Sequence, residues 1–170
     1  NLDALLRMIP FILAGAAAGL ITVWVEKHHV GASGAPWNLS LPYRVLLAGR
    51  VWWFYIAKTI FPYQLTFIYP RWVINAGAPV QYIYPLGALA VFVIPWIARR
   101  QKGRGAFAAL ACYTIALFPA LGFFNIYPMR YSFVADHFQY HAAPFLLTFI
   151  AAVLAQRIPH KIRNSLFAII

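Results

Sequence analysis

Long apolar runs alternate with short polar stretches along this chain. Residues 8–25, 79–98, 105–124 and 141–155 contain almost no charged side chains. A helix needs roughly 17–25 apolar residues to cross the hydrocarbon core of a bilayer, and each run is about that long. The pattern therefore predicts an all-α fold, a polytopic bundle with four membrane-spanning helices.

The segment 43–61 is also apolar, but it contains Arg44, Arg50 and Lys58. On a helical wheel these cations fall within about a third of the circumference. The opposite face holds bulky apolar residues, namely Val45, Trp52, Trp53, Ile56 and Ile60. A central cation in a lipid-exposed span costs about 2.5–3.5 kcal/mol, which favours a helix lying in the headgroup plane. A fifth span whose basic stripe faces a polar cleft is the alternative.

Two short basic connectors, residues 99–104 and 157–163, separate the later apolar runs. Short loops rich in Lys and Arg stay on the cytoplasmic side of a membrane. We therefore expect the polar segments 26–78 and 125–140 on the outer face, with the interfacial helix inside the first of them. The whole chain, residues 1–170, is expected to form a single transmembrane domain.

The composition supports the bilayer as the main solvent of this chain. It is 63% hydrophobic and 10% charged, whereas a soluble domain is roughly 45–50% apolar and about 25% charged. A net charge of +11 would suggest nucleic acid in a soluble protein. Here the cations lie at the ends of apolar runs, where they contact lipid headgroups. We expect membrane lipid as a partner, and no nucleic acid.

Most of the unexpected polar residues lie in the two outer segments. They are Glu26, His28, His29, Arg71, Asn125, Arg130, Asp136, His137 and Gln139. Arginine forms paired hydrogen bonds to phosphate oxygens, so the basic residues here, with Arg50 and Lys58, could bind a lipid phosphate. Ordinary lipid anchoring is the alternative interpretation for each cation.

No complete catalytic motif is visible, and the candidate catalytic residues are Glu26, Asp136 and His137. His137 and His141 are four residues apart and would share a helix face, but Asp136 would point about 100° away. Zinc usually needs a third protein ligand, so no metal site is predicted. A role at a helix start is the alternative for Asp136. The cofactor stays undetermined, with a divalent metal as one candidate.

Three strings together resemble a known family. They are VEKHHVGASG at 25–34, RVLLAGRVWWFYIAKTIFPYQLTFIYPRW at 44–72 and RYSFVADHFQYHA at 130–142. They resemble the membrane half of bacterial polytopic glycosyltransferases of the GT-C fold that carry C-terminal tetratricopeptide repeats. Those enzymes are similar to the eukaryotic transmembrane-and-tetratricopeptide O-mannosyltransferases. The resemblance covers most of residues 25–142.

The resemblance implies transfer of a sugar from a polyprenyl-phosphate donor to a protein or glycan acceptor. It places the site on the periplasmic face of the bacterial inner membrane. By the same analogy the donor phosphate is bound by Arg50, Lys58, Arg71 and Arg130. Asp136 and His137 would line the same cleft. The family's acidic catalytic residue would precede residue 1 and its repeats would follow residue 170, so we interpret the chain as an internal piece of the enzyme.

Two other functions fit the pattern of apolar and basic residues. A transporter or flippase module would need charged residues within facing spans, and few lie inside the apolar runs. A non-catalytic membrane scaffold would tolerate substitution of Arg50, Lys58, Arg130 and Asp136. The sequence alone does not separate this scaffold from part of an enzyme.

Overall fold

The computed structural model describes residues 2–157, and all regular secondary structure within them is helical. The α-helices are α1 (Leu2–Val25), α2 (Leu41–Ile60), α3 (Ile83–Lys102), α4 (Gly105–Leu117) and α5 (Ala143–Arg157). Shorter elements connect them: a π-helical turn at Glu26–Val30 and 3₁₀ turns at Ala35–Trp37, Pro79–Tyr82, Phe118–Ala120, Tyr127–Arg130 and Asp136–Gln139. The predicted all-α class is confirmed for these residues.

Two helical stretches among the described residues, Leu6–Val30 and Pro79–Arg100, are long and apolar enough to cross a membrane. No residue is buried in the most apolar part of either one. Their exposed apolar surface suggests a membrane protein, because a soluble domain rarely exposes so large a patch. The other two apolar helices, Gly105–Ala120 and Ala143–Ala155, are shorter. The structure therefore does not show the predicted count of four spans.

The apolar run 105–124 does not form one continuous helix. The α-helix ends at Leu117, a 3₁₀ turn follows, and the chain bends through residues 121–124. Pro119 lacks the backbone N–H that another α-helical turn requires. Gly122 has a φ of 94°, and a Cβ at this position would lie 2.7 Å from Cδ2 of Leu47. The α-helix therefore ends before the apolar run does, because the chain turns tightly against Leu47 of α2.

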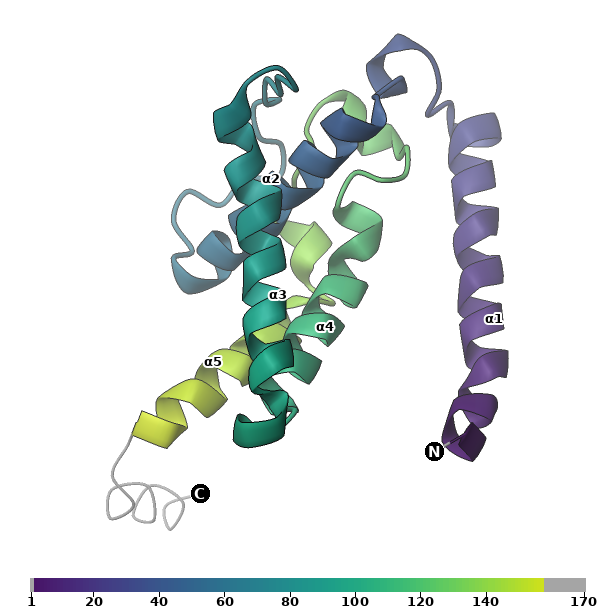
Figure 1. The fold of residues 1–170 in the computed structure, drawn as a ribbon. Helices are drawn as coiled ribbons and strands as arrows, with labels where there is room; N and C mark the ends of the chain where they lie inside the picture. Colours follow the sequence, from purple (N-terminus) through teal and green to yellow (C-terminus); the bar gives the residue numbers. More distant parts are fainter. Residues whose placement is uncertain (1, 158–170) are drawn as a thin grey trace.

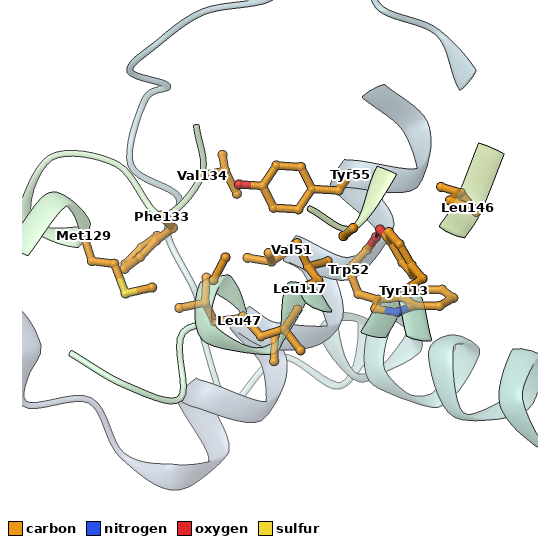
Figure 2. Packing of buried hydrophobic residues seen from close by; sticks show 14 of the residues in the cluster. Leu47, Val51, Trp52, Tyr55, Tyr113, Leu117, Met129, Phe133, Val134 and Leu146 are labelled. Carbon is orange, nitrogen blue, oxygen red and sulfur yellow. Dashed lines mark hydrogen bonds between the residues drawn. The ribbon is translucent and has the colours of Figure 1, made fainter. Parts of the chain in front are cut away.

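The main hydrophobic core is built around α2. Five of its side chains are at most 2% exposed: Leu46, Leu47, Val51, Trp52 and Tyr55. Figure 2 shows α2 side chains packed against α4, α5 and residues 129–134. The indole N–H of Trp52 donates a hydrogen bond to Oγ1 of Thr114 at 2.9 Å. Trp52 was predicted on the apolar face of an interfacial helix, but it lies in the core because Phe92 of α3 and Tyr113 of α4 pack against it.

Figure 1 shows α2 running obliquely across α3, while α1 stands apart from the other helices. A hollow of about 620 Å³ separates α1 from residues 118–126, and small residues of α1 such as Gly15 and Gly19 line it. The side chain of Glu26 joins the end of α1 to the rest of the protein, since Oε2 accepts the backbone N–H of Tyr127 at 2.8 Å. The contact is polar and lies at one end of the helix.

The helices α2 and α3 approach most closely at Gly49. A Cβ on Gly49 would lie 2.5 Å from the backbone nitrogen of Pro85 and 2.7 Å from its Cδ. Both atoms belong to a rigid ring and its backbone, so they cannot move aside as a flexible side chain would. The absence of a side chain at Gly49 therefore sets the distance between the two helices.

The substitution Gly49→Ala is expected to lower the free energy of unfolding by about 1–3 kcal/mol, because it overpacks this crossing. Thermal unfolding in detergent, followed by circular dichroism, measures the effect. Gly19→Ala in α1 is the matched control, since no atom lies within 4 Å of the added Cβ. It should keep or slightly raise stability, because Ala favours the helix over Gly. Equal melting temperatures for the two variants would contradict the close crossing.

Candidate functional site

The two polar segments 26–78 and 125–140 pack against each other. The backbone N–H of Tyr69 donates to Oγ of Ser132 at 3.1 Å. The ring of Phe67 stacks on that of His137, with a centroid separation of 4.6 Å. Stretches that are distant in the sequence therefore form a shared surface that includes Asp136 and His137.

Tyr69 lies between a cation and a carboxylate at this junction. Its hydroxyl donates to the carboxylate of Asp136, with oxygen–oxygen distances of 2.9 and 3.1 Å. Nζ of Lys58 lies 5.2 Å from the centre of the Tyr69 ring. The same ammonium donates to the backbone carbonyls of Tyr63 and Gln64. Lys58 thus holds the start of the segment that brings Tyr69 to Asp136.

A row of aromatic rings continues from Tyr69 to Arg50. Phe54 of α2 contacts Tyr69 and Trp72, with centroid separations of 5.0 and 5.5 Å. The guanidinium of Arg50 lies 4.5 Å from the centre of the Trp72 ring. Arg50, Phe54 and Lys58 are spaced four residues apart and share one face of α2. Two cations of the predicted basic stripe, Arg50 and Lys58, therefore lie against aromatic side chains of the segment 61–78.

The other two predicted phosphate-binding cations contact different rings. Arg71 donates to the carbonyl of Pro36 at 2.8 Å, and its guanidinium lies 4.6 Å from the centre of Phe133. Arg130 is exposed and lies 5.9 Å from the centre of the Tyr131 ring. Lys58 and Arg71 thus bind carbonyls of the protein itself, whereas Arg50 and Arg130 contact aromatic faces in the described part of the chain.

The charge of Arg130 also affects its tyrosine neighbours. Hydrogen bonding from Tyr131 and from Arg130 lowers the pKa of Tyr127. Hydrogen bonding to Tyr127 raises the pKa of Tyr131. The lowered pKa of Tyr127 is thus due first to Tyr131, and Arg130 adds to it.

His137 has a buried ring nitrogen, Nδ1, that lacks a hydrogen-bond partner among the described residues. The ring lines a hollow of about 240 Å³ with Tyr131 and an open one of about 270 Å³ with Asp136. Leaving a buried polar atom unpaired is unfavourable, so Nδ1 of His137 lowers the stability of this junction.

The predicted helix face shared by His137 and His141 is not formed. A 3₁₀ turn, Asp136–Gln139, ends before His141, and α5 begins only at Ala143. Both histidines nevertheless line one hollow of about 290 Å³. In the described residues, no three His, Cys, Asp or Glu side chains are grouped as metal ligands. Asp136 is the first residue of this 3₁₀ turn, as its helix-start alternative expects, but its carboxylate makes no cap hydrogen bond and accepts one from Tyr69.

The structure thus places the candidate residues in two groups. Asp136, His137 and Lys58 lie around the junction with Tyr69 and Phe67, whereas Glu26 binds the backbone of Tyr127. Sequence reasoning missed Tyr69 and Phe67, because nothing local distinguishes them from other aromatic residues at a membrane interface. Comparisons with protein-family models, with curated proteins and with solved structures find no match for this chain.

Proposed function

We propose that this chain is part of a membrane glycosyltransferase that transfers a sugar from a polyprenyl-phosphate donor to a protein or glycan acceptor. The supporting observation is the meeting of Lys58 and Asp136 at Tyr69. A leaving phosphate needs a nearby cation, and an attacking hydroxyl needs a base. In this proposal the apolar runs span the bacterial inner membrane, and the site opens to the periplasm.

The proposed reaction is a direct displacement at the sugar. The acceptor hydroxyl oxygen attacks the anomeric carbon, and the bond from that carbon to the donor phosphate oxygen breaks. Asp136 takes the hydroxyl proton. Arg50 and Lys58 stabilise the negative charge that develops on the departing phosphate.

A non-catalytic membrane scaffold is the second candidate function. Lys58 and Arg71 donate hydrogen bonds to carbonyls of the segments around them, as structural cations do. If the basic residues serve only to hold these segments, a lipid-linked sugar has no binding site here. The two functions differ in what happens when a cation without such hydrogen bonds is removed.

Arg50 is that cation, because its contacts are with the rings of Trp72 and Tyr84. In the intact protein in proteoliposomes, Arg50→Ala is expected to reduce sugar transfer from a polyprenyl-phosphate donor about 10–100-fold. A hydrogen bond to a charged group contributes roughly 1.5–3 kcal/mol, which corresponds to such a factor. Lys27→Ala, which removes an exposed cation from the polar segment 26–78, is the control and should leave transfer unchanged. Undiminished transfer by Arg50→Ala would favour the scaffold.

A further inference from the structure

A second cationic site lies at the turn between α3 and α4. Arg99, Arg100, Gly103 and Arg104 line a hollow of about 490 Å³ there. Figure 1 shows this turn at the end of the bundle opposite residues 26–40 and 121–130. The chain contains only three acidic residues, and none of them lines the hollow. The positive charge of the three arginines is therefore not balanced by a carboxylate of the lining.

An aromatic layer lies directly beneath the arginines. The guanidinium of Arg99 lies 3.5 Å from the centre of the Trp96 ring, and Trp96 packs on Phe107 at 5.0 Å. Aromatic side chains concentrate where the hydrocarbon of a bilayer meets the headgroups. The apolar stretch Pro79–Arg100 ends at the same level. Both observations place the arginine hollow at the depth of lipid headgroups.

The N-terminus of α4 adds to the positive potential of the hollow. The helix begins at Gly105, and no side chain caps its first backbone N–H groups. Free N–H groups and the helix dipole favour an anion at this end. An arginine side chain forms two parallel hydrogen bonds to phosphate oxygens. The guanidinium groups and the N-terminus of α4 therefore favour the same kind of ligand, a phosphate group.

We propose that the α3–α4 turn binds the phosphate of an anionic phospholipid headgroup. Soluble phosphate shares this chemistry, but a hollow at headgroup depth meets lipid phosphate at far higher local concentration. Basic pockets between spanning helices bind anionic headgroups in the same way. This site is independent of the proposed sugar transfer at the other end of the bundle.

Native mass spectrometry of the intact protein in detergent tests the site, with phosphatidylglycerol as the probe and phosphatidylcholine as the neutral comparison. The wild type should retain phosphatidylglycerol preferentially. The double variant Arg100→Gln, Arg104→Gln should bind it about 30-fold more weakly, as expected for two lost cations near a lipid surface. Arg99 stays unchanged to keep its contact with Trp96. The double variant Arg7→Gln, Lys27→Gln removes the same charge elsewhere and should bind like the wild type.

A charge-preserving variant separates electrostatics from folding. Arg100→Lys, Arg104→Lys should keep most of the preference for phosphatidylglycerol, and all variants should have equal helicity. The proposal is overturned if the glutamine variant binds phosphatidylglycerol as tightly as the wild type, or if the lysine variant loses it as completely as the glutamine variant. Displacement of the lipid by an equal concentration of inorganic phosphate would overturn the assignment to lipid.

Discussion

Replacing Arg44 with Ala is expected to lower the free energy of unfolding by about 3–5 kcal/mol, because several backbone carbonyls lose their hydrogen-bond donor at once. The guanidinium of Arg44 is half-buried between the start of α2 and the turn after α4. Its nitrogens donate to the carbonyls of Leu39, Trp37, Gly122 and Phe123 and to Oδ1 of Asn125, over 2.7–3.2 Å. One side chain thus holds residues 122–125, which follow α4, against the start of α2.

Thermal unfolding in detergent checks this expectation, and the loss corresponds to a decrease of about 10 °C in melting temperature. Arg50→Ala is the matched control on the same helix, since Arg50 contacts rings rather than carbonyls. Arg44→Lys should not restore stability, because an ammonium cannot reach as many acceptors in a planar fork. A melting temperature for Arg44→Ala equal to that of Arg50→Ala would show that the network adds no stability.

Arg44 also shows what a helical wheel can and cannot predict. The wheel placed Arg44, Arg50 and Lys58 on one side of a helix, and the structure has a helix at Leu41–Ile60. The wheel gives angles only, and most acceptors of Arg44 lie far away in the sequence, around residue 123. Without those partners, the wheel grouped Arg44, which binds backbone carbonyls, with Arg50 and Lys58, which lie against aromatic rings.

The helices themselves were predictable, but their ends and their burial were less so. Hydropathy located α1 and α3 because each contains a long, continuous run of apolar residues. Hydropathy overestimated the length of the helix within the run 105–124, since it takes no account of the close turn at Gly122. The helical wheel placed Trp52 on the apolar face of an interfacial helix, although the ring centres of Tyr113 and Phe92 lie within 6.0 Å of its own. The end of α4 and the burial of Trp52 both depend on residues that pack there from other segments, and the sequence of one segment does not reveal them.

The sequence drew attention to the charged residues of the candidate site but not to its aromatic residues. Asp136 and Lys58 stand out in a chain with few carboxylates, so composition alone draws attention to them. Their connection depends on Tyr69, whose role follows only from the path of the segment 61–78. The unpaired Nδ1 of His137 is likewise a result of packing against Phe67.

Asp136→Asn is expected to reduce sugar transfer by about 10²–10⁴-fold, the usual contribution of a general base. The amide oxygen can still accept the hydrogen bond from Tyr69, so the contact between the segments persists while the negative charge and the proton acceptor are lost. Transfer from a polyprenyl-phosphate sugar in proteoliposomes measures the effect, and an unchanged melting temperature excludes unfolding as its cause.

Glu26→Gln is the matched control, since it makes the same carboxylate-to-amide change at another acid of the polar segments. The carboxylate of Glu26 accepts the backbone N–H of Tyr127, and an amide oxygen can accept it as well. Transfer by Glu26→Gln should therefore stay close to that of the wild type. If Asp136→Asn also transfers normally while Arg50→Ala does not, the donor binds here but Asp136 is not the base. If all three variants transfer normally, the carboxylate at Tyr69 only joins two segments of a membrane scaffold.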